Sequence, residues 1–387
     1  MPLSARRHRL AALVARLAAT LATGILATTI TLASGSAALA AAPATFAAAA
    51  STASAAAAAH AAAPDSVIPS GSGASGTTGL NYVALGDSYS AGYGLTPYSD
   101  SPAPGCYQAD ANYPHLIAKA LGMNLTDATC SGAVTANIID TPQVTEPGHS
   151  APVQSDALSA STDVVTVTIG GNDFGFGPVA ASCIALSATG PTLTTYDSCK
   201  QFYDFDGHDY LAGTIPAVAA AVKHAFDVIH QKAPNAKIFV IGYPAIAPDA
   251  THIPANTGCF TSLIGTGQPP FPQNSYPFTD IDVPYLHDLE SQLDAAIHQQ
   301  ADAVGATFIP TFEQTVGNSP CANNPDAYIN GISLEPDASA PHVTPTTPQG
   351  QPLTLDGQTL ALKLGALHPN EAGVHFIEGK VQAAISA

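Results

Sequence analysis

Positive charge is scarce in this sequence of 387 residues, which has 11 lysines and arginines against 29 aspartates and glutamates and a formal net charge of −18. All four arginines (Arg6, Arg7, Arg9 and Arg16) lie near the N-terminus, so the rest of the chain has none. Such a chain does not attract nucleic acid or anionic membranes. It also lacks the guanidinium groups that clamp phosphate and carboxylate ligands. We therefore predict no nucleic-acid partner and no nucleotide-handling chemistry.

Several common functional motifs are missing as well. No GxSxG elbow is present, which disfavours the α/β-hydrolase type of serine esterase, and there is no P-loop. The sequence GSGASG at 71–76 precedes the first predicted strand instead of following one, so it does not fit a dinucleotide-binding turn. No CxxC or HxxxH spacing occurs. We predict that the protein uses neither a cofactor nor a metal ion.

The first 40 residues have the three parts of a secretory signal peptide. A basic stretch precedes an apolar run from about Leu17 to Ala33, and the small-residue sequence Ala38-Leu39-Ala40 follows. We expect cleavage after Ala40 and secretion to the extracellular space, without stable membrane insertion. An uncleaved anchor is the alternative, but the run is rich in Thr and Ala and barely long enough to span a bilayer. No cysteine follows the run, so a lipoprotein is unsupported.

A low-complexity segment follows at 41–79. Sixteen of residues 41–63 are alanine, and GSGASGTTG occupies 71–79. This composition buries too little side chain to offset the entropy of ordering, so we predict a disordered linker. The remaining residues, 80–387, are enough for one folded domain. Without its arginine-bearing N-terminus the chain has seven lysines against 29 acidic residues, a formal charge of −22.

The six cysteines all follow the linker. An even number of cysteines in an exported chain indicates three disulfides, for which 15 pairings are formally possible. They are Cys106, Cys130, Cys183, Cys199, Cys259 and Cys321.

Short apolar runs alternate with helical patterns over the domain. The predicted strands are Tyr82–Leu85, Val164–Ile169, Ile238–Ile241 and Thr307–Ile309, and apolar residues repeat with helical spacing over 211–229 and 286–304. Buried strands alternating with helices predict a three-layer α/β/α sandwich with a mostly parallel central sheet. In such sheets ligands bind at the carboxyl ends of the strands.

Two proline-rich segments have no helical or strand period. They are residues 258–284 and 320–352, and within the second we interpret 335–352 as an insertion. Long loops in a compact domain commonly form the rim of a site. Phe271, Tyr276 and Phe278 suit contact with an acyl chain, although simple loop packing is the alternative interpretation.

Four short motifs follow predicted strands or loops in a fixed order. They are GDSYSAGYG at 86–94, CSGA at 130–133, IGGND at 169–173 and LHPNEAG at 367–373. Ser88 directly follows the first strand, where a helix N-terminus presents backbone N–H groups to a developing anion. An ordinary helix-capping serine is the alternative for this residue alone.

Together the four motifs closely resemble those of the SGNH/GDSL hydrolase family, which has a flavodoxin-like fold. The resemblance implies that Ser88 attacks an ester carbonyl while His368 accepts and later returns the proton. It also implies an oxyanion hole made by the N–H groups of Ser88 and Gly132 and the side-chain amide of Asn172. The implied substrate is a small-molecule or lipid ester.

One position departs from the common family pattern. Many members have an aspartate three residues before the histidine, but this chain has Gly365. The imidazole still needs a partner at its second nitrogen. We predict a Ser88–His368 dyad oriented by a main-chain carbonyl near Gly365 or Ala366. A distant carboxylate such as Asp356 is the less favoured alternative.

The six-cysteine layout and the segment from Cys321 to Leu334 resemble the secreted lipase and esterase branch of the family in filamentous actinobacteria. That resemblance implies consecutive disulfides: Cys106–Cys130, Cys183–Cys199 and Cys259–Cys321. The preferred function is a secreted, monomeric lipase or esterase. A carbohydrate acetylesterase with the same catalytic groups is one alternative, and a non-catalytic surface-binding protein on the same scaffold is another.

Overall fold

The computed structural model describes residues 76–146, 148–192, 196–266, 270–322, 326–335 and 361–387, with three further pairs at 342–343, 354–355 and 358–359. The predicted signal peptide, most of the predicted linker and most of the predicted insertion at 335–352 lie outside the described residues. Asp356 lies outside them too.

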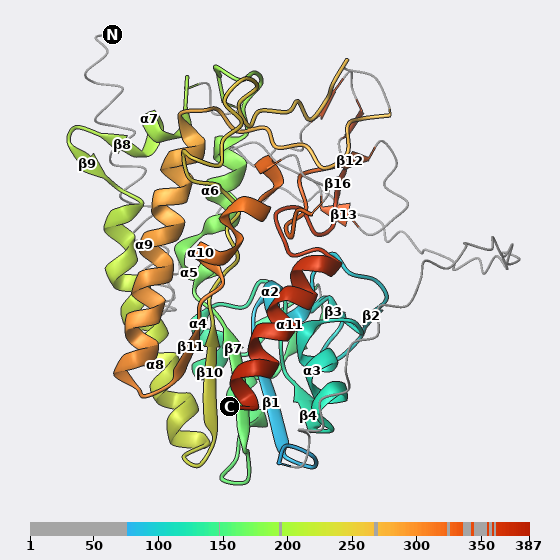
Figure 1. The fold of residues 1–387 in the computed structure, drawn as a ribbon. Coiled ribbons are helices and arrows are strands. Elements are labelled where there is room, and N and C mark those ends of the chain that lie inside the picture. Colours follow the sequence, from blue (N-terminus) through green and yellow to red (C-terminus); the bar gives the residue numbers. More distant parts are fainter. Residues whose placement is uncertain are drawn as a thin grey trace, which may run out of the picture. The chain divides into compact units, whose positions relative to one another are not determined.

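A five-stranded parallel sheet forms the centre of the domain (Figure 1). Its strands are β1 (Asn81–Gly86), β4 (Asn124–Asp127), β7 (Val164–Thr168), β10 (Lys237–Ile241) and β11 (Thr307–Ile309). The spatial order is β11-β10-β7-β1-β4. Counted along the chain this is the flavodoxin-like order 2-1-3-4-5, whose topological switch point lies between β1 and β7. The predicted fold class and all four predicted strands are confirmed.

Strand β4 is the one strand of this sheet that the sequence analysis missed. Its sequence is NLTD, and its residues are exposed or half-buried. It pairs only with β1, at the edge of the sheet. Strand β4 has one apolar residue among exposed and half-buried polar ones, so it carries no apolar run for a sequence pattern to detect.

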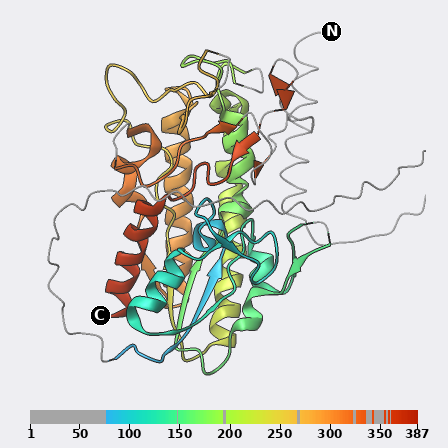
Figure 2. The same ribbon diagram turned by 90° about the vertical axis from the view of Figure 1, so that its right-hand side faces the viewer.

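Helices cover both faces of the sheet. Helices α8 (Ile215–Lys232), α9 (Asp282–Ala303) and α4 (Thr135–Ile139) pack on one face, and α3 (Tyr113–Leu121) and α11 (Glu371–Ile385) on the other. In both views α11 lies beside α3 (Figures 1 and 2).

The side chains of β1 alternate between two hydrophobic cores. Val83 and Leu85 point into the core under α8 and α9, whereas Tyr82 and Ala84 point into the core under α3 and α11. All four side chains are buried. This two-sided burial is why the strand has an apolar run and no alternation of polar and apolar residues.

The predicted helices over 211–229 and 286–304 are confirmed as α8 and α9. The stretch Ala212–Lys232 is long and apolar enough to cross a membrane by length and composition. Val218, Val222 and Phe226 on this stretch are buried in the core, which accounts for its apolar character. Helix α11 begins after Asn370, whose side chain accepts a hydrogen bond from Gly373 N.

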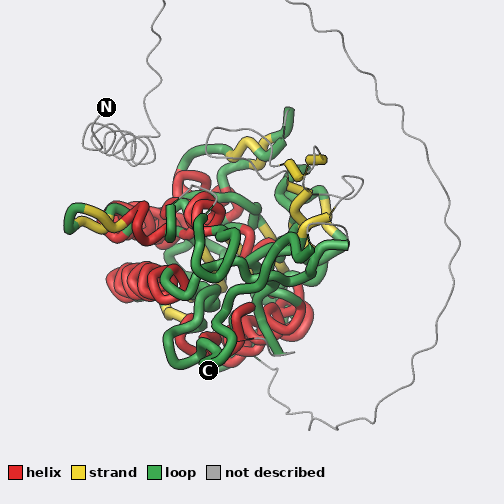
Figure 3. The backbone as a smooth tube through the Cα atoms, turned by 90° about the horizontal axis from the view of Figure 1, so that it is seen from above, coloured by secondary structure: helices red, strands yellow, loops and turns green. Residues whose placement is uncertain are grey.

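The shorter elements gather mainly in the loops. The further helices are α2 (Ser88–Ala91), α5 (Gly171–Phe174), α6 (Phe176–Cys183), α7 (Cys199–Tyr203), α10 (Phe312–Thr315), and the 3₁₀ turns Gln154–Ala157, Ala212–Thr214, Val316–Asn318 and Pro320–Ala322. Short antiparallel pairs are β2 (Tyr98–Ser99) with β3 (Gln108–Ala109), β5 (Gln143–Val144) with β6 (Ser150–Ala151), β8 (Asp204–Phe205) with β9 (His208–Asp209), and β14 (Thr354–Leu355) with β15 (Gln358–Thr359). Strand β16 (Ala361–Lys363) pairs with β12 (Leu334–Glu335) and β13 (His342–Val343). Seen from above, loops cover the end of the domain that is at the top of Figure 1 (Figure 3).

Three disulfides join the loops and short helices. They are Cys106–Cys130, Cys183–Cys199 and Cys259–Cys321, so the six cysteines pair consecutively.

Candidate active site

Ser88 lies at the carboxyl end of β1, as the first residue of the short helix α2. Asp87 caps this helix by accepting a hydrogen bond from Tyr89 N at 3.0 Å. Gly86 makes the turn possible, because its φ is +130° and an added Cβ would lie 2.4 Å from the carbonyl oxygen of Thr168. Gln154 fixes Gly86 from the other side, accepting from its N–H at 2.7 Å and donating to its carbonyl at 2.9 Å.

His368 approaches Ser88 from the segment before α11. Its Nε2 lies 2.7 Å from Ser88 Oγ, and its Nδ1 lies 2.8 Å from the carbonyl oxygen of Ala366. Because a carbonyl can only accept, Nδ1 carries the proton and Nε2 accepts from the serine hydroxyl. Leu367 has a φ of +59°, an unusual backbone conformation for a leucine that lets the chain fold back between the ring and its carbonyl partner.

The histidine is electrically neutral in this setting. Burial lowers the pKa of His368 to about 4, and the hydrogen bond to the Ala366 carbonyl opposes that shift. A carbonyl stabilises the imidazolium less than a carboxylate would, because it brings no negative charge. A serine hydroxyl on a neutral, oriented imidazole is the arrangement needed to move a proton off the hydroxyl.

At Gly365, where many members of the SGNH/GDSL family that this chain resembles have an aspartate, the backbone of a second loop occupies the space of a side chain. Gly365 has a φ of +87°, and an added Cβ would lie 2.6 Å from Gly94 Cα. Gly94 has the same relation to Gly365, with an added Cβ at 2.5 Å. Two glycines thus allow the serine-bearing and histidine-bearing loops to touch, and no side chain fits between them.

Gly132 lies in the turn after β4 and Asn172 directly after β7, on either side of β1 in the sheet, and both line the same cavity as Ser88 and His368. Asn172 belongs to α5, directly after β7, and its Nδ2 donates to the carbonyl of Ala133 at 2.9 Å. That bond orients the amide and leaves its second N–H available. Gly132 has a φ of +82° and is exposed toward the cavity. Within the described residues, the N–H groups of Ser88 and Gly132 have no hydrogen-bond partner.

A buried polar network below Ser88 escaped the sequence analysis. Gly171 N donates to Tyr243 Oη at 2.9 Å, and Tyr243 Oη donates to the carboxylate of Asp87. Burial raises the pKa of Asp87 to about 7, although the Tyr243 hydrogen bond favours the charged form. The network ties together the ends of β1, β7 and β10. Asp87 and Gly171 belong to the GDS and IGGND motifs, whereas Tyr243 has no sequence signal.

The cavity above Ser88 has a volume of about 700 Å³. Its wall is largely apolar and comes mainly from α6, α9 and the segment after β10. These lining residues include Phe176, Pro178, Ala180, Ala181, Ile184, Pro244, Ile246 and Leu293. Helix α6 therefore supplies much of the apolar wall, which the sequence analysis placed in the proline-rich segment 258–284.

The prediction that Phe271, Tyr276 and Phe278 line an acyl site is wrong. These side chains are buried, and none of them is among the residues lining the cavity. Tyr276 and Phe278 pack edge to face, with ring centroids 4.7 Å apart. The aromatic rings in the proline-rich segment pack in the core beneath the loop, which was the alternative interpretation.

Acidic side chains also line the cavity, but the described residues contain no cluster of three or more histidine, cysteine or acidic side chains suited to a metal ion. Glu290 accepts hydrogen bonds from Ile246 N at 2.8 Å and Ala247 N at 3.2 Å. Burial raises the pKa of Glu290 to about 8 and that of Asp294 to about 7. Through its two hydrogen bonds Glu290 fixes the segment after β10, which forms one wall of the cavity.

Known proteins share this sequence and architecture. A lipase of Streptomyces coelicolor, Lipase 2, is 37% identical over 251 residues, covering 64% of this chain and 75% of that protein. An esterase of Streptomyces scabiei is 29% identical over 286 residues, covering 68% and 79%. The crystal structure of phospholipase A1 from Streptomyces albidoflavus NA297 superimposes with a TM-score of 0.53 at 22% identity, covering 80% of this chain and all of that one. This last likeness concerns the fold.

The sequence profile of the GDSL-like lipase/acylhydrolase family matches residues 84–375, a span that contains all four motifs. The chain therefore belongs to the GDSL-like lipase/acylhydrolase family.

Proposed function

We propose that this protein is a secreted serine ester hydrolase that cleaves acyl esters through an acyl-enzyme on Ser88. The observation that carries the proposal is the 2.7 Å contact between Ser88 Oγ and the neutral His368 Nε2 at the base of the cavity. Membership of the lipase/acylhydrolase family and the likeness to a lipase and an esterase support an ester as the substrate.

In the proposed reaction His368 acts first as a base and then as an acid. Nε2 accepts the Ser88 proton as Oγ attacks the ester carbonyl, and it later donates that proton to the leaving alcohol. The Ala366 carbonyl accepts from Nδ1–H throughout and holds the ring. No carboxylate takes part, so the machinery is a dyad. If Asp356→Asn lowered turnover by several orders of magnitude in a folded protein, the dyad would be wrong.

The developing oxyanion is proposed to accept hydrogen bonds from Ser88 N, Gly132 N and Asn172 Nδ2. All three residues line the cavity, and each has an N–H without an assigned partner in the described part of the chain. Each donor of this kind contributes about 3 kcal/mol to transition-state stabilisation.

The apolar wall formed mainly by α6 suits an acyl chain longer than acetyl. We propose a lipid or other apolar acyl ester, acted on by a monomer outside the cell. The three disulfides support an oxidising compartment.

Two assays test the proposal. A fluorophosphonate probe should label the wild-type protein and fail to label Ser88→Ala. A series of p-nitrophenyl esters from C2 to C16 should be hydrolysed with a preference beyond acetyl. Absence of labelling in folded protein would favour a non-catalytic binding protein, and activity confined to acetyl esters would favour a carbohydrate acetylesterase.

A further inference from the structure

The proposed oxyanion donor Gly132 lies in a tight turn. Ala133 N donates to the carbonyl of Cys130 at 3.1 Å, which closes a four-residue turn with Ser131 and Gly132 at its centre. The φ of +82° at Gly132 is that of the third residue in a type II turn. In the commoner type I turn, the peptide between the two central residues faces the opposite way.

The direction of that central peptide decides whether the oxyanion hole exists. The carbonyl of Ser131 and the N–H of Gly132 belong to one planar trans peptide, so they point in opposite directions. Glycine adopts negative φ about as readily as positive φ, so residue 132 does not by itself fix the peptide. A flipped peptide would turn the Gly132 N–H away from the cavity and the Ser131 carbonyl oxygen toward it.

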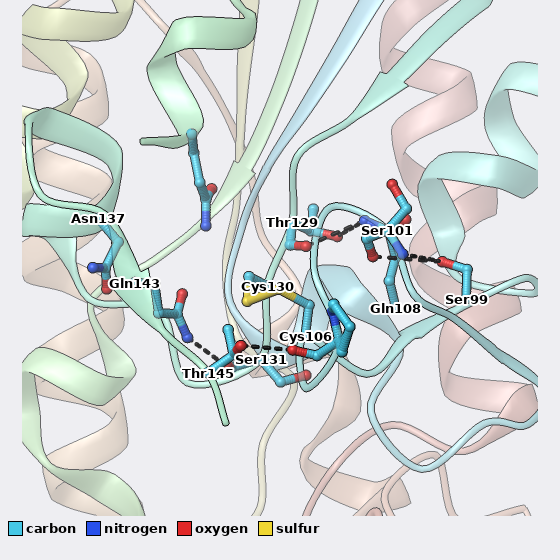
Figure 4. The surroundings of a disulfide bond; sticks show 12 residues. Ser99, Ser101, Cys106, Gln108, Thr129, Cys130, Ser131, Asn137, Gln143 and Thr145 are labelled. Carbon is cyan, nitrogen blue, oxygen red and sulfur yellow. Dashed lines mark hydrogen bonds between the residues drawn. A yellow bond between two sulfur atoms is a disulfide. The ribbon is translucent and has the colours of Figure 1, made fainter. Parts of the chain in front are cut away.

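Gln143 contacts this peptide on the side of its carbonyl. Gln143 Nε2 donates to the Ser131 carbonyl oxygen at 2.7 Å, a bond available in only one orientation of the peptide. Figure 4 shows the Gln143 amide directed at Ser131, beside the Cys106–Cys130 disulfide. An added Cβ on Gly132 would meet only one atom within 4 Å, Gln143 Nε2 at 3.6 Å.

The rest of the turn is anchored independently of Gln143. The disulfide joins Cys130 to Cys106, Ser131 N donates to the Cys106 carbonyl at 2.9 Å, and Cys130 N donates to the carbonyl of Gly86 at 3.1 Å. These contacts fix the start of the turn, but none of them touches the carbonyl of Ser131. Among the described residues, Gln143 is therefore the one that fixes the orientation of the central peptide.

Stability alone does not explain a glutamine at this position. Gln143 Oε1 and Ser131 Oγ are both buried without a hydrogen-bond partner in the described structure. Burying an unsatisfied polar atom lowers stability, so these two oxygens offset part of the stabilisation that the hydrogen bond to the Ser131 carbonyl provides. The amide is useful here for the one hydrogen bond that it donates.

We infer that Gln143 is a positioning residue for ester hydrolysis, which holds the Ser131–Gly132 peptide with its N–H in the oxyanion hole. The inference rests on the proposed function. It assigns a catalytic consequence to a side chain in the β5–β6 hairpin that belongs to none of the four family motifs.

Two substitutions test this role. Gln143→Leu removes the donor, and we expect kcat to fall about tenfold, the factor that corresponds to one hydrogen bond of about 1.4 kcal/mol, with KM changed by less than about twofold. Gln143→Glu keeps the shape but presents an acceptor to the Ser131 carbonyl, so kcat should fall further at pH 7. The ratio of its kcat to that of the wild type should recover toward pH 4, where the introduced carboxyl is protonated and can donate.

Inhibitor binding separates positioning from a structural role. A trifluoromethyl ketone forms a tetrahedral adduct whose oxyanion needs the hole, so its affinity should weaken by the same factor as kcat/KM. An ether analogue of the substrate has no carbonyl and should bind equally to both proteins. Val144→Thr, on the neighbouring residue whose side chain is 79% exposed, is the matched control and should behave like the wild type.

The outcomes are distinguishable. A Gln143→Leu protein with wild-type kcat would overturn this inference while leaving the proposed function intact. Equal weakening of the ketone and the ether, accompanied by a lower Tm, would show a structural role instead and would also overturn it. Wild-type protein that hydrolyses no ester would overturn both proposals.

Discussion

At the scale of single residues, main-chain groups hold His368 where many members of the family have a carboxylate. The Ala366 carbonyl accepts from Nδ1, and Asn330 flanks the histidine by donating its N–H to the His368 carbonyl and accepting from Leu367 N. The close packing of Gly94 against Gly365 leaves no space for an acidic side chain. The proposed dyad would thus follow from how closely the two loops approach.

Introducing the common family residue should therefore harm this protein. Gly365→Asp would place Cβ 2.6 Å from Gly94 Cα at a φ of +87°. We expect the free energy of unfolding to fall by about 2 kcal/mol or more and ester hydrolysis to decrease. Chemical denaturation and a p-nitrophenyl ester assay would measure the two effects. Gly379→Asp, where an added Cβ meets nothing within 4 Å, is the control. Increased activity with unchanged stability would contradict the prediction.

The low pKa of His368 predicts the acid limb of the pH–rate profile. Only the neutral imidazole can accept the Ser88 proton, so activity is lost as the pH falls through the pKa of about 4. We expect kcat/KM for an uncharged ester to rise through a midpoint near pH 4 and to be level by pH 6. A midpoint near 6.5, the ordinary value for histidine, would show that burial does not shift this group.

At the scale of secondary-structure elements, α6 supplies much of the wall of the cavity. This helix follows directly after α5, which carries Asn172. The Cys183–Cys199 disulfide anchors its last residue to the start of α7. Ala181 lines the cavity and is otherwise exposed, so the residue at this position controls the volume of the cavity without taking part in the core.

Filling this wall should shorten the preferred acyl chain. For Ala181→Phe we expect kcat/KM for C10 to C16 esters to fall at least about tenfold, because the ring takes up volume that a long chain needs. Activity on C2 and C4 esters should be nearly unchanged, because Ser88 and His368 are not altered. Ala181→Ser serves as a control of similar size. Equal loss at every chain length would indicate damage to the fold and not to the acyl site.

At the scale of the whole molecule, both the acidic surface and the buried acidic groups make the folded protein less stable as the pH rises. Burial raises the pKa values of Asp87 and Asp294 to about 7 and that of Glu290 to about 8. The folded protein therefore keeps protons that the unfolded chain releases above about pH 4, so stability decreases as the pH rises through 7 to 8. His368 acts in the opposite sense, because its lowered pKa reduces stability as the pH falls from 6.5 toward 4.

We predict a stability maximum on the acid side of neutrality, because the carboxyl groups with a raised pKa outnumber the groups with a lowered pKa. Lower pH also relieves repulsion in a chain with so few cations. Calorimetric Tm values between pH 4 and 9 should be higher at pH 5 than at pH 8.5, and Glu290→Gln should reduce the difference. A maximum well above pH 7 would refute the prediction.

Local patterns predicted the centre of this fold but not its margins. Strands β1, β7 and β10 are buried on their inner positions, and β11 ends on the half-buried Phe308 and the buried Ile309, so each leaves an apolar run that can be recognised without knowledge of the fold. Helix α6 leaves no comparable signal, because several of its apolar residues face the cavity instead of a packed core. A sequence pattern does not distinguish apolar residues that face a cavity from those that face a packed core. For this reason the buried Phe271, Tyr276 and Phe278 were wrongly placed at an acyl site.

The sequence by itself determined four of the five strands of the sheet, the family motifs and the candidate residues Ser88, Gly132, Asn172 and His368. These features depend on residue type, spacing and order along one chain. Only the tertiary structure decided which groups support them. The contacts between Gly94 and Gly365, between Asp87 and Tyr243, and between Gln143 and Ser131 join residues from separate loops. Strand order and loop approach bring these partners together, and neither is encoded in a local pattern of residues.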